Sequence, residues 1–446
     1  MAQHDFRAGA AAASISPRPD DLRAGVWLGG FGSYRQRRAT SVRDGPQCRA
    51  IALSDGTTTL VLAALDLVGA SGRLLGAIRA EAAGLTGVPG AWIMLACTHS
   101  HASPDMQGLW GGTSAAYEHY VAHSAATAIG EACGAMSPAT AEAATTRLGG
   151  VVRNRRDWPD TDETLTTLRM RSLDGAPVAT VVNYACHPTA SGAANTEVSR
   201  DWCGYVVDAV ERETGGIAIY VNGAIGDVNP ARDGGFEAAE ALGHAVARAS
   251  IESLDAAHRV GGTLAVRTVP LAVPMNLARL SQRVQDAVAR AGPALSVLSR
   301  AGGLHAASLA LHAAGRGDLA QIVAALGAMT ERTHETRNGT TFVMTQCGYI
   351  RIGSEVEALT APGEVLTRLA LPLRASLGAR HRLFLGLTHD TLGYFVPEDE
   401  WMSGRNNNYE ESVSFGKRAG AALVEALVSM VHGDGPIRER AGDGRP

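Results

Sequence analysis

The chain alternates between short apolar runs and longer segments of helical composition, and this alternation limits the fold more than any other feature. Residues 59–66 and 91–97 are predicted buried strands, and the segment 71–83 between them is long enough for a crossover helix. The same order continues to about residue 255, with further strands expected at 165–173, 178–186, 217–222, 261–275, 340–346 and 382–388 and further helices near 116–135, 203–213 and 236–253. This pattern predicts an α/β fold in which mixed β-sheets are layered with α-helices.

The 446 residues are expected to form one large domain over 1–434, followed by a short tail at 435–446. The tail is polar and rich in glycine and arginine, so we expect it to be disordered. Within the domain, 278–334 is almost entirely helical in composition and is predicted to be a helical insertion. That insertion either covers a cleft or forms a packed helical subdomain without a function of its own.

Composition excludes several classes of function and partner. The net charge of −4 and the charged fraction of 19% give no reason to expect nucleic acid or an anionic membrane as a partner. Lys417 is the only lysine and is not part of a P-loop motif. No run of about 20 apolar residues predicts a membrane span, and no secretory signal is recognisable. None of the six cysteines has Cys-x-x-Cys spacing, so free thiols and a cytoplasmic location are expected.

Histidines follow two of the predicted strands. His99 and His101 belong to the motif Thr-His-Ser-His directly after the strand 91–97, and we expect them to point to the same side of the pleat. Imidazole is the commonest protein ligand for metals. A hydrogen-bonded histidine pair is the alternative interpretation. His187 ends another strand, where Pro188 stops the sheet, and is either a ligand or a structural histidine.

Four further polar motifs occur at turns or strand ends. Glu364 follows a Pro-Gly turn, where it could act as a ligand or simply begin a helix favourably. Tyr394 lies in a polar loop after the strand 382–388, and Tyr409 lies shortly beyond it. Arg155 sits in the polar connection Asn-Arg-Arg-Asp, and a glycine-rich turn at 222–230 follows another strand. Each motif alone is compatible with an ordinary loop.

Taken together and in this order, these motifs resemble the neutral ceramidase family. The resemblance begins near Ala8 and continues through Thr-His-Ser-His, Asn-Arg-Arg, His-Pro-Thr, Gly-Asp-Val-Asn-Pro, Pro-Gly-Glu, Gly-Tyr and Tyr-Glu. It does not cover 278–334. The resemblance implies a ceramidase-like catalytic domain from a short bacterial relative, without the immunoglobulin-like C-terminal domain of the full-length family members.

The resemblance also implies a zinc site and residues that act around it. Zn²⁺ would be held by four ligands: His99, His187, Glu364 and Tyr394. Three residues would act on the zinc-bound water and the scissile amide: His101, Arg155 and Tyr409. Two residues of the glycine-rich turn would contact the substrate: Asp227 and Asn229. Asn229 stands where the family usually has a serine, so a serine nucleophile at this position is excluded.

The implied function is a zinc-dependent amidohydrolase that cleaves an N-acyl bond by direct attack of a zinc-bound water. The expected partner is a small soluble N-acyl compound, and the oligomeric state is not predicted. A true ceramidase acting on N-acylsphingosine and a lactonase or esterase remain alternatives, as does a zinc-containing binding protein without turnover. A serine hydrolase elbow, Gly-x-Ser-x-Gly, and the zincin motif His-Glu-x-x-His are both absent from the sequence.

Overall fold

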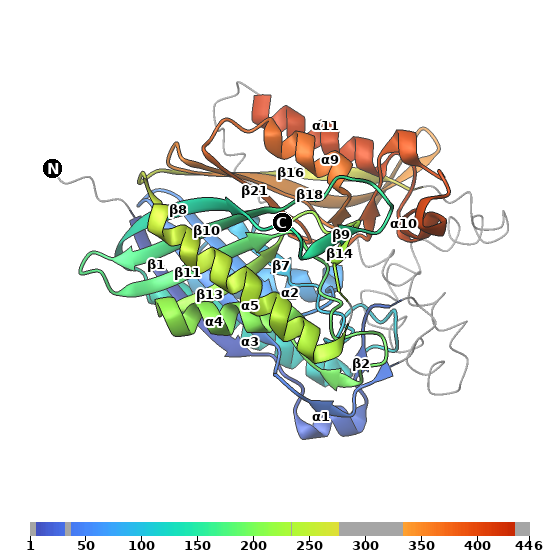
Figure 1. Ribbon diagram of the computed structural model, residues 1–446, viewed down its shortest axis with the longest axis horizontal. Helices are drawn as coiled ribbons and strands as arrows, with labels where there is room; N and C mark the ends of the chain where they lie inside the picture. The colour runs from blue at the N-terminus through green and yellow to red at the C-terminus, as the bar shows by residue number, and fades with distance from the viewer. Residues whose placement is uncertain (1–5, 32–36, 233, 276–332, 433–446) are drawn as a thin grey trace, which may run out of the picture.

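The computed structural model describes residues 6–31, 37–232, 234–275 and 333–432. Two β-sheets pack face to face, and helices cover the outer face of each sheet (Figure 1). The layers therefore follow the order helix, sheet, sheet, helix, which confirms the predicted α/β class with mixed sheets. Nearly all of the expected insertion at 278–334 and the whole expected tail at 435–446 lie outside the described residues. Of the insertion, only 333–334 is described, and it leads into a strand.

In the described part of the chain the larger sheet has nine strands. Their order is β13-β11-β10-β8-β1-β5-β6-β7, with β15 beside β8. Most neighbours are antiparallel, but the pairs at the two edges, β11 with β13 and β6 with β7, are parallel. The strands are β1 (Phe6–Ser14), β5 (Gln47–Ser54), β6 (Thr59–Leu65), β7 (Ile93–Cys97), β8 (Ser137–Arg147), β10 (Thr164–Ser172), β11 (Pro177–Tyr184), β13 (Ile217–Asn222) and β15 (His258–Val260).

The second sheet has the order β16-β18-β19-β21, with β17 beside β18, and its β19–β21 pair is parallel. Its strands are β16 (Leu264–Pro274), β17 (His334–Arg337), β18 (Thr340–Ile352), β19 (Val356–Thr360) and β21 (His381–Leu385). Short pairs connect the loops between the layers: β2 (Trp27–Leu28) with β3 (Arg37–Arg38), β4 (Ser41–Val42) with β12 (Glu197–Val198), β9 (Val152–Asn154) with β14 (Val228–Pro230), and β20 (Glu364–Val365) with β22 (Tyr394–Phe395).

Separate apolar clusters hold the helices against the sheets. α2 (Gly72–Thr86) and α3 (Ala115–Gly134) pack on the larger sheet near β5 to β7, α4 (Asp201–Thr214) and α5 (Gly235–Ser253) pack near β10 to β13, and α9 (Thr367–Ala375) and α11 (Ala419–His432) cover the second sheet. The ends of α2 follow ordinary capping chemistry, because Ser71 accepts a hydrogen bond from the Leu74 amide and Gly87 adopts φ +71°. The short helices α1 (Pro19–Ala24) and α10 (Tyr409–Val413) lie outside these layers.

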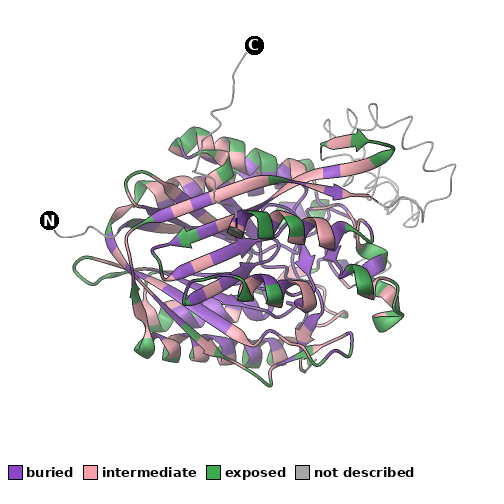
Figure 2. Ribbon diagram, turned by 90° about the horizontal axis from the view of Figure 1, so that it is seen from above, coloured by how far each residue is buried: buried purple, intermediate pink, exposed green. Residues whose placement is uncertain are grey.

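Burial follows from this layering. In β5, alternate side chains face the helices on one side and the second sheet on the other, so Cys48 and Ala50 belong to one core and Ile51 and Leu53 to another. Strands covered on both faces need apolar residues at nearly every position. Figure 2 shows the buried strands inside and the exposed residues on the outer helices and loops. None of the helices in the described residues is both long and apolar enough to cross a membrane.

The structure contains elements that the sequence analysis does not predict, among them β1, β5, β8, β19 and α11. The strands β1 and β8 at the centre of the larger sheet are not predicted, because both are rich in alanine, which has a weak β propensity. Long antiparallel pairing with β5 and β10 stabilises β1 and β8 despite the weak β propensity of their residues. A helix is expected to begin near Glu364. Glu364 itself lies in β20, and the helix α9 begins three residues later at Thr367.

Candidate metal centre

The residues singled out by the sequence come together where parallel strands end. His99 follows β7 and His187 follows β11, although these strands lie at or near opposite ends of the larger sheet. The sheet curls so that its edges meet. The side-chain amide of Asn222, at the end of β13, donates hydrogen bonds to the carbonyl oxygens of Cys97 at 3.0 Å and Thr98 at 2.7 Å. Sites in α/β folds commonly form at the carboxyl ends of parallel strands.

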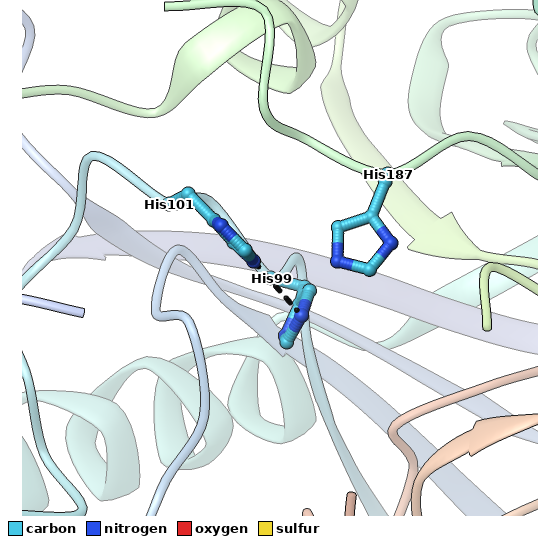
Figure 3. Close-up of side chains that lie close together, drawn as sticks. All are labelled: His99, His101 and His187. Atoms are coloured by element: carbon cyan, nitrogen blue, oxygen red, sulfur yellow. Dashed lines mark hydrogen bonds between the residues drawn. The ribbon is translucent and has the colours of Figure 1, made fainter. Parts of the chain in front are cut away.

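Three histidine rings converge at this point (Figure 3). The ring centroids of His99, His101 and His187 lie 4.8 to 5.0 Å apart, and their possible ligand atoms all lie within 4.8 Å of one another. All three side chains are buried. His99 has φ +66°, so the chain leaves the extended conformation after β7. The expected reason for the His99–His101 approach, a shared face of a pleated strand, is therefore wrong, although the two rings do meet.

Two of the histidines direct the same nitrogen into the site. The Nδ1 atoms of His99 and His187 are hydrogen-bonded to the backbone carbonyls of Val68 and Ile225, the latter at 3.0 Å. Because a carbonyl can only accept, each Nδ1 carries the proton and each Nε2 keeps its lone pair. Both Nε2 atoms lie near the Oε2 atom of Glu364, at 3.4 Å from His99 and 3.5 Å from His187. Backbone carbonyls that accept a hydrogen bond from one ring nitrogen typically orient a histidine that binds a metal through the other.

His101 has the opposite tautomer. The backbone amide of Phe31 donates to Nδ1 of His101 at 3.2 Å, so the proton of a neutral His101 resides on Nε2. That Nε2 lies 3.2 Å from Nε2 of His99. The three histidines form a possible metal-binding group by distance alone, but the tautomers favour Glu364 over His101 as the third ligand. Gly30 leaves room for the His101 ring, since a Cβ there would lie 2.3 Å from two ring atoms.

The short parallel pair of β20 and β22 sets Glu364 directly beside Tyr394. Both side chains are buried. Burial alone would raise the pKa of Glu364, but His99, His187 and the Tyr394 hydroxyl lower it to about 2. Burial lowers the pKa of His187 to about 3. The site therefore presents an ionised carboxylate beside neutral imidazole.

Unsatisfied atoms show that this donor set suits a cation. Nε2 of His187 and Oε2 of Glu364 are buried and have no hydrogen-bond partner among the described residues. Buried polar atoms without partners cost free energy, so their convergence calls for a group that accepts their lone pairs. Two imidazole nitrogens and one carboxylate oxygen match the ligand set of catalytic zinc sites. Tyr394, the expected fourth ligand, lies beside Glu364, and burial raises the pKa of its hydroxyl well above the ordinary value.

Arg155 and Tyr409 border the same site. The guanidinium of Arg155 lies 5.2 Å from the ring centre of Tyr394 and 5.6 Å from that of Tyr409. It is held by Glu410, which accepts from its Nε at 2.8 Å, and by the carbonyl of Gly226 at 2.6 Å. Tyr409 is 36% exposed, whereas the four expected zinc ligands are all buried. A cation and a phenol therefore lie beside the expected metal ligands.

The two residues of the glycine-rich turn differ in their surroundings. Asp227 is fully buried, and its carboxylate accepts hydrogen bonds from Asn154 and from the amide and hydroxyl of Thr367 at the start of α9. These bonds give Asp227 a positioning role between the turn and α9. Asn229 lies in β14, and its Oδ1 atom is buried without a partner among the described residues. It remains a candidate for a substrate contact.

Two residues that position the site were not singled out from the sequence. Asn222 joins the sheet edges, and its only sequence signal is its place at the head of the glycine-rich turn. Arg37 is buried and donates to the carbonyl oxygens of Gly29 and His101, both at 2.5 Å. Nothing in the local sequence around Arg37 indicates this contact, because its partners are distant in the chain or lie in an irregular loop.

The comparisons with known proteins agree with this geometry at the level of the fold. No protein-family model and no curated protein matches the sequence. The crystal structure of neutral ceramidase from Pseudomonas aeruginosa matches with a TM-score of 0.71 at 18% identity, over 96% of this chain and 74% of that chain. This chain has the neutral ceramidase fold. A ceramidase complexed with C2 matches with a TM-score of 0.70 at 18% identity, over 96% of this chain and 75% of that chain.

The structural match extends over 96% of this chain at 18% identity, so the two proteins share a fold although most of their side chains differ. The fold resemblance inferred from the sequence is thus confirmed.

Proposed function

We propose that this protein is a zinc-dependent hydrolase of amide bonds that acts on a small N-acyl compound. The observation that carries the proposal is the convergence of two histidine Nε2 atoms on Oε2 of Glu364, two of these atoms being buried without a partner among the described residues. The structural neighbours are named ceramidases, and ceramide is an N-acyl compound. Tyr394 completes the proposed ligand set of His99, His187, Glu364 and Tyr394.

A bound zinc ion would polarise the substrate carbonyl and lower the pKa of a water molecule. The remaining functions fall to side chains of the chain itself. Arg155 and Tyr409 are placed to donate hydrogen bonds to the oxyanion that develops when the carbonyl is attacked. Removing one donor of this kind typically lowers the rate about 100- to 1000-fold. The cation–π contacts of Arg155 with Tyr394 and Tyr409 keep its charge beside the site.

His101 is proposed to transfer the proton. Burial, together with His99 and His187, lowers its pKa well below the ordinary value, so it is neutral at rest. With its proton on Nε2 it can donate to the leaving amine or to the oxyanion. Accepting a proton at Nε2 requires the other tautomer, in which the Phe31 amide no longer donates to Nδ1. The Phe31 contact thus favours the tautomer in which Nε2 of His101 donates a proton over the tautomer in which Nε2 accepts one.

Attack by water without an acyl-enzyme follows from Asn229. An amide side chain cannot form an acyl ester, but it can donate and accept hydrogen bonds at a substrate. The unpartnered Oδ1 of Asn229 suits such a contact. We propose that Asn229 orients the substrate while a water molecule attacks its carbonyl, with expulsion of the amine and release of the acid.

Metal analysis combined with a turnover assay tests this proposal. We expect one zinc per chain in protein purified without added metal, and hydrolysis of N-acyl substrates that strong chelators abolish and zinc restores. A panel with matched amide, ester, lactone and ceramide substrates identifies the bond cleaved. His389 provides a matched control, because it is also a buried histidine after a strand but bonds Gln346 and Thr360 instead. His187→Ala should lose zinc and His389→Ala should keep it. Full activity after chelation would refute the zinc-dependent mechanism.

A further inference from the structure

Tyr409 is carried by a segment with an unusual backbone. Tyr409 is the first residue of the helix α10, which follows the turn Arg405–Asn408 and lies at the right of Figure 1. Asn406, Asn407 and Asn408 have φ values of +45°, +52° and +54°. Asparagine tolerates the left-handed region better than most residues, but consecutive residues there still cost free energy. A conformation of this kind persists only when surrounding contacts hold it.

Those contacts come from a buried arginine. The guanidinium of Arg156 is completely buried and donates to Oε2 of Glu410 at 2.6 Å. It also donates to both carboxylate oxygens of Glu411, at 3.0 and 3.2 Å. Glu410 and Glu411 are themselves buried and directly follow Tyr409. A guanidinium can serve two carboxylates because it presents several donors in a rigid plane, which a lysine cannot do.

The same carboxylate links Arg156 to the site. Glu410 binds Arg156 through Oε2 and Arg155 through Oε1, at 2.8 Å from the Arg155 Nε. Asn406 also donates to Oε1 of Glu410, at 2.7 Å. Glu410 therefore fixes the guanidinium of Arg155, the strained turn and the first turn of α10 at once. Two arginines and two glutamates balance in charge, which buried ionic groups require.

We infer that Arg156 is a positioning residue of the hydrolase, which acts through Glu410 and Glu411 to hold Tyr409 and Arg155 at the reacting carbonyl. This inference rests on the proposed function, since it gives those two residues their task. Arg156 itself is completely buried and does not meet the substrate. Exchanging a buried ion pair for apolar residues is often neutral for stability, so a role in orientation explains three buried charges and the nearly buried Arg155 better than fold stability does.

A double-mutant cycle between Arg156 and Tyr409 tests the inference. Arg156→Lys keeps the charge but loses the planar set of donors, and we expect kcat to fall about 10- to 100-fold while zinc content and KM stay close to those of the wild type. In a Tyr409→Phe background the same substitution should have a smaller effect, because the hydroxyl of one of the two residues that it positions is already gone. A purely structural role would instead give equal effects in both backgrounds, and that result would overturn the inference.

A readout independent of activity separates this inference from the proposed function. In Arg156→Lys, amide hydrogen exchange should accelerate in residues 404–413 and remain unchanged in the two sheets. Arg374→Lys is the matched control, since Arg374 bonds Asp162 and Thr164 away from Tyr409. Unchanged exchange in 404–413 would overturn the inference even in an active enzyme. If the wild type shows no zinc-dependent hydrolysis, the proposed function fails, while accelerated exchange would still establish the anchoring by Arg156. Glu411→Gln, which is isosteric, repeats the test should Arg156→Lys not fold.

Discussion

Replacing Asn222 by alanine should damage both the fold and the metal centre. Its side chain is completely buried and donates two hydrogen bonds, to the carbonyl oxygens of Cys97 and Thr98. Each buried carbonyl left without its donor costs about 1–3 kcal/mol, so the variant should lose about 2–6 kcal/mol of unfolding free energy. Proteins are typically stable by only about 5–15 kcal/mol, so this loss is readily measured.

The second effect concerns the peptide that carries His99. Asn222 binds the carbonyl of Thr98, the residue that precedes His99, and His99 is held at φ +66°. A non-glycine residue in this region stores about 1–3 kcal/mol of strain, which the surrounding contacts must hold. Without Asn222 we expect the His99 ring to lose its fixed position and zinc affinity to fall about 10- to 100-fold.

Asn183 offers a matched control for this experiment. It is also buried, and its side-chain amide also donates to two carbonyl oxygens, those of Val221 at 2.9 Å and Phe384 at 3.1 Å. Urea unfolding of the metal-free proteins should show similar losses for Asn222→Ala and Asn183→Ala. Competition with a chromophoric chelator should show weakened zinc binding for Asn222→Ala alone. Equal zinc affinities for the two variants would refute the claim that Asn222 positions His99.

Three further predictions concern the site itself. His99→Ala and His187→Ala should lose zinc in elemental analysis, whereas His101→Ala should keep zinc and lose turnover, and the reverse pattern would show that the roles are exchanged. Asn229→Ser should keep zinc and measurable turnover, while Asn229→Leu should fail more severely because it removes a hydrogen-bonding group; an acyl adduct found by mass spectrometry in the wild type would contradict direct attack by water. Gly30→Ala should retain zinc but lower kcat about 100-fold, because its Cβ would displace the His101 ring; an unchanged kcat would show that the ring is not held by this contact.

Much of the fold follows from local pattern. Strands buried on both faces need continuous apolar residues, and this made β6 and β7 recognisable. The residues Asp174-Gly175 between β10 and β11 are typical of a hairpin turn, and Gly175 has φ +87°. β1 and β8 could not be found in this way, because their alanines gain strand structure only from the neighbours with which they pair.

The amino-acid sequence alone predicts which residues carry the proposed chemistry. Imidazoles, a carboxylate and a phenol at strand ends and turns were enough to select His99, His187, Glu364 and Tyr394 as a set, once their order resembled a known family. The type and the order of these residues can be read directly from the sequence. The distances between them cannot, because they depend on how the chain folds.

The arrangement of these residues depends on tertiary contacts. The curling of the larger sheet brings the ends of β7 and β11 together, and it depends on contacts such as Asn222 with Thr98 that join residues more than one hundred positions apart. Partners 70 and 38 positions away set the tautomers: the Phe31 amide for His101 and the Ile225 carbonyl for His187. Each imidazole can bind a metal or donate a proton, and the hydrogen bond on its other nitrogen selects between the two. That choice is made by packing, which no local stretch of sequence encodes.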